Sequence, residues 1–231
     1  NWQDELLKKA SFKTQANIND SGGSGAGRYY ISVSYLNQGG MYKHTDLNDY
    51  DTQVRSERYN FRSNLDVDLS KRLKMELNLG GIILDNNFPG QAAGTIFSAI
   101  QKTPSFWYPM TNPDGTIGEI AGKNANPYAL LTQTGYGDHH TTTLNATLGL
   151  SWDMSGLVKG LTAKGRISFD NSNWRNVYVN LSYKSYSFTI DENETDLSKG
   201  TYSSVGDGDT TLGYSVNANG WRTVVLEGSL N

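Results

Sequence analysis

The sequence of 231 residues contains no cysteine, so it can form neither a disulfide framework nor a cysteine-ligated metal site. It also lacks any run of about 18 apolar residues, the length that a membrane-spanning helix needs. Hydrophobic residues make up 36% of the chain, and its mean hydropathy of -0.55 is one that a soluble protein would show. Membrane β-strands dilute hydropathy in the same way, because every second residue in them is polar. The low hydropathy therefore excludes helical membrane proteins only.

The chain has no excess of charge of one sign. Its net charge is -3, and acidic and basic residues are mixed along it. A nucleic-acid-binding surface needs clustered positive charge, so the sequence argues against a nucleic-acid partner. Glycine (25 residues) and tyrosine (14 residues) are abundant, which favours strands and turns over helices.

The clearest pattern consists of two alternating stretches, 58–69 and 73–80, joined by a turn at 70–72. Side chains of a strand point to opposite faces with a period of two, so each stretch has an apolar and a polar face. Each arm approaches or reaches the roughly 9–11 residues of a tilted membrane strand, whereas soluble strands usually have about 5–6. We predict a transmembrane β-hairpin, with a long edge hairpin of a soluble sheet as the alternative. Four charged residues of the polar face are predicted to face the interior: Arg58, Arg62, Asp66 and Asp68.

Five further stretches alternate in the same way and are predicted strands: 10–18, 28–37, 143–154, 161–183 and 221–231. The polar residues 171–176 predict a bulge near Asn173, which gives seven strands, or a turn, which gives eight. The predicted fold is all-β: an antiparallel transmembrane β-barrel segment with long extracellular loops. Trp152 and Trp221 are predicted to lie in the aromatic girdles at the membrane borders.

Short turns at 70–72 and 155–160 alternate with long loops at 38–53, 85–139 and 191–210. Outer-membrane barrels have short periplasmic turns and long extracellular loops, whereas compact soluble domains rarely tolerate a loop as long as 85–139. Seven strands would leave open edges in lipid, so further strands are expected outside this sequence. The chain starts without a signal peptide and stops within an alternating stretch. We therefore expect residues 1–231 to be a barrel domain that is incomplete at both ends.

Four aromatic residues are candidates for binding a substrate. Phe106, Trp107 and Tyr108 lie in the longest predicted outer loop, and Trp174 lies in the predicted bulge. Flat apolar rings, two types of which also donate hydrogen bonds, suit the faces of sugar rings. The alternative is that these rings pack against the barrel wall or against a lid.

Other residues offer little chemistry. His139 and His140 are adjacent in a strand and face opposite ways, so they cannot chelate a metal together, and His44 is isolated. The acidic stretches 191–196 and 207–209 offer clustered oxygen ligands of the kind that calcium prefers, but they fit no EF-hand spacing. Solvated outer loops are the favoured interpretation, with calcium binding as the alternative. The glycine-rich stretch 21–27 is predicted to be a tight turn, because no Lys-Ser/Thr pair follows it as in a phosphate-binding loop. We find no nucleophile elbow, HExxH motif or acid–base pair, so neither enzymatic activity nor a cofactor is predicted.

Several segments, in order along the chain, resemble the SusC/RagA-like branch of TonB-dependent outer-membrane transporters. They are the lead NWQDEL at 1–6, SGG at 21–23 followed by RYYISVSYLNQGG at 28–40, RYNFRSNLD at 58–66, and the loop segments 104–112, 114–115 and 126–127. The resemblance covers most of the first two-thirds of the chain and thins beyond Gly160.

This resemblance implies a barrel of about 22 strands around an internal plug, in the outer membrane of a Gram-negative bacterium of the Bacteroidetes type. It also implies a SusD-like surface lipoprotein as a lid, energy supplied by the TonB complex, and import of glycans or peptides. The plug and the segment that contacts TonB are not in this sequence. From the residues alone, a soluble carbohydrate-binding or adhesive β-sandwich is the alternative.

Overall fold

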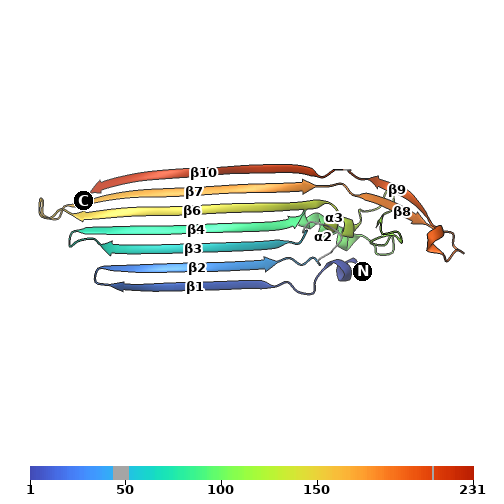
Figure 1. The fold of residues 1–231 in the computed structure, drawn as a ribbon, viewed down its shortest axis with the longest axis horizontal. Coiled ribbons are helices and arrows are strands. Elements are labelled where there is room, and N and C mark those ends of the chain that lie inside the picture. Colours follow the sequence, from blue (N-terminus) through green and yellow to red (C-terminus); the bar gives the residue numbers. More distant parts are fainter. Residues whose placement is uncertain (44–51, 210) are drawn as a thin grey trace.

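The computed structural model describes residues 1–43, 52–209 and 211–231. Seven long strands form one antiparallel sheet in the order β1-β2-β3-β4-β6-β7-β10 (Figure 1). Their bounds are β1 (Lys13–Ser24), β2 (Gly27–Gly39), β3 (Arg55–Asp68), β4 (Leu73–Pro89), β6 (Gly135–Asp153), β7 (Thr162–Asn180) and β10 (Gly213–Leu230). The prediction of seven antiparallel strands is confirmed. The sheet is open, with β1 and β10 at its edges among the described residues.

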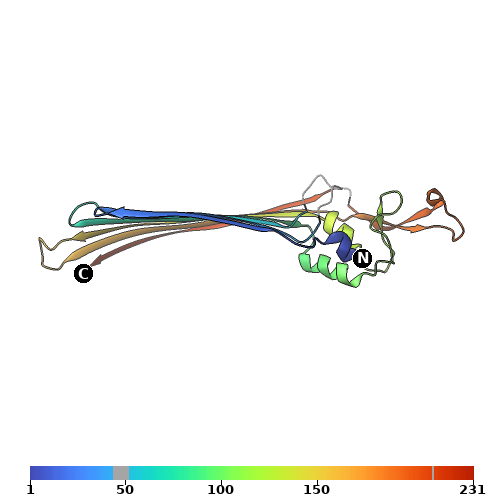
Figure 2. The same ribbon diagram turned by 90° about the horizontal axis from the view of Figure 1, so that it is seen from below.

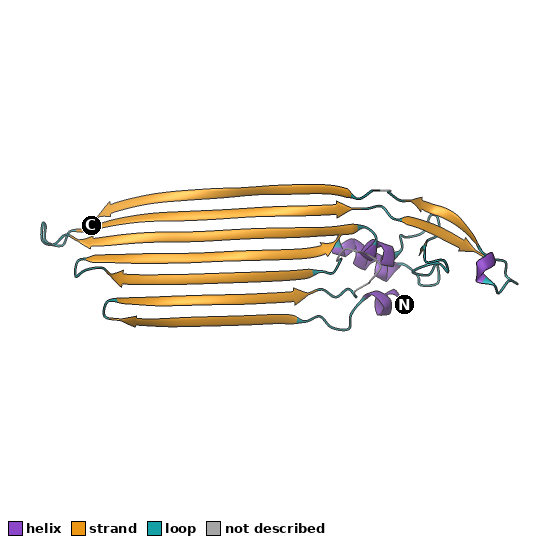
Figure 3. Cartoon of the chain, in the orientation of Figure 1, coloured by secondary structure: helices purple, strands orange, loops and turns teal. Residues whose placement is uncertain are grey.

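The remaining elements gather at the end of the sheet where the long connections lie, which we call the loop end (Figure 3). They are the helices α1 (Trp2–Leu6), α2 (Ala93–Lys102) and α3 (Pro127–Thr132), the 3-10 helix η1 (Leu197–Lys199) and a small sheet of β5 (Ile117–Gly118), β8 (Lys184–Thr189) and β9 (Thr201–Asp207). None of the described helices has the length and apolar character needed to cross a membrane.

The large sheet is a single layer when seen edge-on (Figure 2). Its apolar side chains are not sealed in a core: Phe61 is 43%, Leu148 36% and Ile167 42% exposed. A β-sandwich would bury these residues between two sheets packed face to face. The alternative of a soluble sandwich is therefore wrong, because no second sheet covers either face among the described residues.

Strand register places most apolar residues of the large sheet, including those of the most regular alternating stretches, on one face, which we call the apolar face. One row of directly opposite residues is apolar across six strands: Tyr29, Leu65, Leu77, Leu148, Ile167 and Leu226. The other face, which we call the polar face, carries the residues between them in sequence. This alignment requires a common register, because a slip of one residue would move a strand's apolar set to the other face.

The apolar stretch on the apolar face crosses the rows of paired residues obliquely. On β3 it ends toward the loop end at Tyr59, beyond which Glu57 is polar. The row through Tyr59 meets β10 at Gly220. The apolar stretch of β10, however, ends at Val224, four residues lower, next to Arg222. Four residues correspond to about 13 Å along the strands, and the four strand spacings from β3 to β10 correspond to about 19 Å across them. The border of the apolar stretch is therefore inclined by roughly 35° to the rows of paired residues, which is close to the tilt of barrel strands.

Several boundaries differ from those predicted. The β1–β2 turn contains only Gly25 and Ala26, because β1 continues through the glycine-rich stretch to Ser24. The predicted loop 85–139 is shorter, since β4 extends to Pro89 and β6 begins at Gly135. The predicted loop 191–210 contains η1 and β9, and β10 begins at Gly213 rather than at residue 221.

The bulge predicted near Asn173, and the turn that was its alternative, are wrong. Strand β7 is continuous from Thr162 to Asn180 and pairs without a register shift with both β6 and β10. Residues 171–176 lie beyond the apolar stretch of the sheet, where both faces can be polar without cost. The apolar-polar alternation is lost there because the surroundings of the strand change, although the strand itself is not interrupted.

Three glycines of the large sheet lie beneath the aromatic ring of the residue directly opposite. The pairs are Gly22–Tyr29, Gly81–Phe61 and Gly137–Phe88. A ring folded over a glycine protects backbone that would otherwise have no side-chain cover and fixes the local register.

We expect Gly81→Ala to destabilise the sheet by about 1–3 kcal/mol, because an added Cβ overpacks the site. That atom would stand 2.1 Å from Cε1 of Phe61. Gly165→Ala is the matched control, since no heavy atom lies within 4 Å of a Cβ at that position. Thermal unfolding of the two variants measures the difference. Equal melting temperatures would show that the Phe61 ring moves aside without loss.

The one extended hydrophobic cluster of the described residues lies at the loop end and outside the large sheet. It contains eight buried residues from α1, α2, α3 and the connections: Trp2, Leu6, Tyr42, Ile96, Ile100, Tyr108, Leu130 and Leu131. We call it the loop-end cluster. Ile96 and Ile100 share one face of α2 because residues four apart in a helix do so. The lead segment 1–6 contains α1, which contributes Trp2 and Leu6 to this cluster.

Candidate functional site

The four charged residues predicted to face an interior all lie on the polar face of β3. Asp66 forms an ion pair with Arg28 of β2 at 2.7 Å, and Asp68 forms one with Lys74 of β4 at 3.5 Å. Arg58 donates to the side-chain oxygen of Asn60 at 2.9 Å. These contacts follow from strand register, since the partners are opposite or close neighbours on one face.

A hollow of about 470 Å³ opens on the polar face around Arg58 and Arg62. Its lining comes from four strands: Tyr30, Ser32, Ser34, Arg58, Asn60, Phe61, Arg62, Gly80, Gly81, Ile82 and Asn145. Gly80 lies directly opposite Arg62 and has no side chain, which leaves space for the hollow. The Arg62 guanidinium has no hydrogen bond or ion pair with any residue that the structure describes, so it is available to a group outside this chain.

The three aromatic residues of the long connection lie in different surroundings. Phe106 is 84% exposed, and Trp107 is half-buried with the Lys123 ammonium 5.0 Å from its ring centre. Tyr108 is 5% exposed, belongs to the loop-end cluster and donates its hydroxyl to the carbonyl of Asn124. Burial raises the pKa of Tyr108 to about 12. Of the predicted substrate-binding residues in this connection, Tyr108 therefore offers no ring face to a ligand in this structure.

The tryptophans of the large sheet divide between its faces. Trp152 lies on the apolar face near the short turns, as a girdle residue would. Trp221 lies on the polar face, directly opposite Ser172, so its prediction as a girdle residue is wrong. Trp174 is also on the polar face, within β7 and not in a bulge or outer loop, and is 37% exposed.

Two buried polar residues organise the long connection. Asn126 is fully buried, caps α3 by accepting from the amide of Tyr128, and donates its side-chain NH₂ to the carbonyls of Pro109, Met110 and Gly118. Asn112 similarly donates to the carbonyl of Tyr186 in β8.

Glu119 joins the same connection to the chain that follows β7. Its carboxylate accepts hydrogen bonds from the hydroxyls of Tyr183 (2.5 Å) and Ser185 (2.8 Å) and from the amide of Asn126 (2.7 Å). Burial, and then the bond to Glu119, raise the pKa of Tyr183. Sequence reasoning missed Glu119. For Asn126 a signal existed, because an asparagine before a proline is typical of a helix start.

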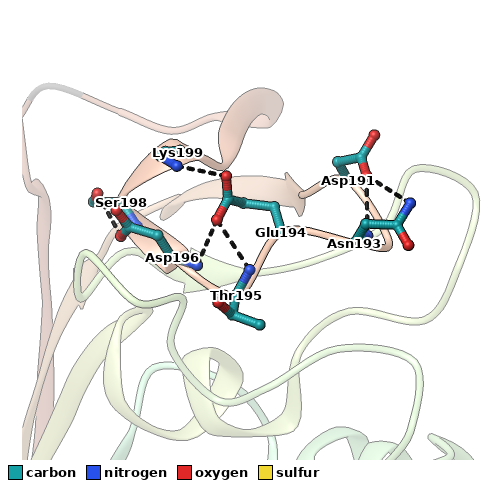
Figure 4. A network of polar contacts seen from close by, with 7 residues as sticks. All are labelled: Asp191, Asn193, Glu194, Thr195, Asp196, Ser198 and Lys199. Carbon is teal, nitrogen blue, oxygen red and sulfur yellow. Dashed lines mark hydrogen bonds and ion pairs between the residues drawn. The ribbon is translucent and has the colours of Figure 1, made fainter.

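The acidic loop after β8 satisfies its own carboxylates (Figure 4). Glu194 accepts from Lys199 at 2.6 Å and from two backbone amides, and Asp196 accepts from Ser198. Asp191 accepts from the amide of Asn193. Among the described residues, no group of three His, Asp or Glu side chains is placed to hold a metal ion.

We expect this acidic loop to loosen in acid. The Lys199 ammonium lowers the pKa of Glu194, and bonds from Ser198 lower that of Asp196. A carboxylate whose pKa falls on folding stabilises the folded state above its unfolded pKa, about 4, and the stabilisation is lost as pH falls through the folded pKa. Hydrogen exchange of residues 191–199 should accelerate below pH 4, beyond the intrinsic change. Glu194→Gln should weaken this pH dependence, and an unchanged dependence would contradict the assignment.

The two adjacent histidines face opposite ways, as the strand pattern predicts. His139 contacts the Tyr178 hydroxyl at 2.8 Å through Nε2, and His140 contacts Asp85 at 2.5 Å through Nδ1. They share no ligand position. His44 lies outside the described residues.

Comparison with known proteins adds to this geometry. No family model matches the chain. TonB-dependent receptor P3 of Formosa agariphila is 31% identical over 182 residues, which are 74% of this chain and 17% of that protein. TonB-dependent receptor P26 of the same organism is 33% identical over 134 residues, covering 55% of this chain and 12% of that protein.

Solved structures share the fold. The RagAB peptide importer in its closed-closed state matches 96% of this chain and 30% of its own chain, with a TM-score of 0.55 and 19% identity. A second structure, of the RagAB peptide transporter, matches 99% of this chain and 31% of its own chain, with a TM-score of 0.51 and 19% identity. The chain corresponds to part of a SusC/RagA-like TonB-dependent transporter.

This SusC/RagA-like chain spans less than a fifth of the length of the curated relatives and about a third of the structural neighbours. The predicted all-β, antiparallel fold is confirmed, and its open sheet matches part of the barrel-like neighbours. The relatives are named receptors and the neighbours an importer or transporter, which fits a protein that is not an enzyme.

Proposed function

We propose that the chain is part of the wall of an outer-membrane barrel that imports a nutrient into a Gram-negative bacterium. The apolar face meets lipid, and the polar face, with Arg58, Arg62, Asp66 and Asp68, lines the interior. The observation that carries the proposal is the continuous apolar row across six strands, on a face against which no second sheet of the described residues packs. In water such a face would be an aggregation site, and in lipid it is the required surface.

The energy source and partners follow from the family. We propose that a plug outside this sequence connects the barrel to the TonB complex, and that a SusD-like surface lipoprotein covers the loop end. The structural neighbours are named the RagAB peptide importer and the RagAB peptide transporter, and their joint name supports a partner subunit in the proposal. The proposed cargo is an oligosaccharide or a peptide. Phe106, 84% exposed at the loop end, is then the member of the predicted aromatic set best placed to meet cargo or lid.

Open edges support the proposal that residues 1–231 form an incomplete barrel domain. Strands β1 and β10 have one unpaired side each among the described residues. Lipid cannot hydrogen-bond such an edge, so the strands on either side must come from elsewhere.

Site-directed spin labels test which face meets lipid. Residues 1–231 contain no cysteine. Once any cysteine in the rest of the intact transporter has been replaced, labels can be placed singly at Asn64, Leu65, Thr147 and Leu148. At positions 65 and 148, the spin label should collide more often with oxygen, which concentrates in lipid, than with a water-soluble nickel complex. The ratio should reverse at 64 and 147. Equal ratios at all four positions, or a folded monomer in buffer without detergent, would refute the proposed function.

A further inference from the structure

The polar face changes character toward the loop end, where aromatic rings replace charge. Five rings share this face by strand register: Phe88 of β4, His139 of β6, Trp174 and Tyr178 of β7, and Trp221 of β10. We call this set the aromatic lane. Its members lie beyond the apolar stretch of the apolar face, on the half of the sheet nearest the long connections.

The rings of the lane follow one another diagonally across adjacent strands. Ring centres are 4.5 Å apart between Phe88 and His139 and 5.2 Å apart between His139 and Tyr178, both edge to face. Trp174 is opposite Asn219, and Trp221 is opposite Ser172, so the two tryptophans are diagonal neighbours. Such neighbours are about 7–8 Å apart at Cα, within reach of aromatic side chains. The lane therefore extends about 20 Å along the strands.

The tryptophans of the lane are open to a ligand. Trp174, on the inner strand β7, is 37% exposed, and Trp221, on the edge strand β10, is 55% exposed, although both belong to a face that would look into the barrel. The Tyr178 hydroxyl contacts Nε2 of His139 at 2.8 Å, which holds those two rings in place. An exposed tryptophan on an interior face costs free energy in water unless something covers it.

The side chains between the rings are neutral. On the polar face of β6, β7 and β10, the residues that alternate with the lane are hydroxyls and amides: Thr141, Thr143, Ser172, Asn176, Ser215, Asn217 and Asn219. None is charged. Toward the short turns the same strands carry Asp170, Arg166, Lys164 and Glu227 on this face, so the change is sharp.

This combination selects a class of ligand. Rings that present flat apolar faces bind the C–H faces of sugars, and amides and hydroxyls exchange hydrogen bonds with sugar hydroxyls. A peptide with charged side chains, or an acidic glycan, would lose water from its charges and find no opposite charge between the rings. We propose that the aromatic lane binds a neutral oligosaccharide on its way through the barrel, an inference that rests on the proposed function.

Binding to the intact transporter tests the lane. The probes are neutral hexasaccharides with glucan, mannan, xylan and galactan backbones, a hexagalacturonate, and a mixed hexapeptide pool. We expect at least one neutral hexasaccharide to bind and the hexagalacturonate and peptides to bind more weakly. Trp174→Ala and Trp221→Ala should each weaken that binding roughly tenfold. Trp174→Phe, which keeps a ring, should restore most of it.

Trp152→Ala is the matched control, since it removes the same side chain from the apolar face. It should leave the dissociation constant unchanged. The proposal is overturned if no neutral hexasaccharide binds, if peptides alone bind, or if binding is indifferent to both lane variants. Spin-label ratios report separately on the membrane proposal. If those ratios fail while Trp174→Ala still weakens binding tenfold, the lane is a glycan site on a sheet that does not meet lipid.

Discussion

Replacing Leu148 with arginine should destabilise the membrane-inserted protein by about 2–4 kcal/mol, the cost of a basic side chain at the middle of a bilayer. Leu148 lies in the central row of the apolar face, between Leu77 and Ile167, and is 36% exposed on the bare sheet. In the proposed membrane this exposed surface contacts hydrocarbon, which cannot solvate a guanidinium. Two measurements report the effect: unfolding by guanidinium chloride in lipid vesicles, and the amount of the protein found in the outer membrane.

Thr147→Arg is the matched control, because the neighbouring residue points to the polar face and pairs there with Ser168. An arginine in a wet interior keeps its water, so we expect a change of at most about 1 kcal/mol. Similar losses in both variants would mean that the two faces do not differ in their surroundings. A stable Leu148→Arg protein would remove the main support for membrane insertion.

Asn126→Ala should open the long connection while leaving the strands intact. The change removes the cap of α3 and leaves the carbonyls of Pro109, Met110 and Gly118 without their donor. Losing a helix cap costs about 1 kcal/mol and each buried unpaired group about 1–3 kcal/mol, less where water enters. Amide hydrogen exchange across residues 90–134 should accelerate on the order of a hundredfold.

The control for this change is Asn124→Ala. Asn124 is exposed, and within the described part of the chain its side chain makes a single, long hydrogen bond of 3.5 Å to the carbonyl of Lys102. It should have little effect on exchange. If Asn126→Ala exchanged no faster than this control, the loop-end cluster alone would hold the connection closed.

The strands were predictable from sequence where lipid is expected on one side. Alternation in 58–69 and 73–80 is strong because one face must be apolar and the other polar. Beyond the apolar stretch this constraint ends, which is why β7 was predicted to bulge near Asn173 and why β10 was recognised only from residue 221. Both strands continue through this region because backbone hydrogen bonds to their neighbours hold them, although the side chains no longer alternate.

The loop end was less predictable. Helix α2 has Ile96 and Ile100 on one face, a signal too short to stand out in a long polar connection. Glu119 contacts Tyr183, 64 residues away, and nothing local marks such a partner. The faces of Trp174 and Trp221 likewise depend on register across neighbouring strands, so their place in one lane appears only in the structure.

The height of the apolar stretch on β3 and β4 has a consequence for where this protein can reside. About eleven residues, tilted as barrel strands are, match a hydrocarbon layer about 25 Å thick. The bacterial outer membrane is thinner than an average bilayer, and a mismatch costs fractions of a kcal/mol for each ångström. In lipids with long acyl chains, the bilayer would have to thin around these strands, so chain length in a reconstitution should govern how well the protein inserts.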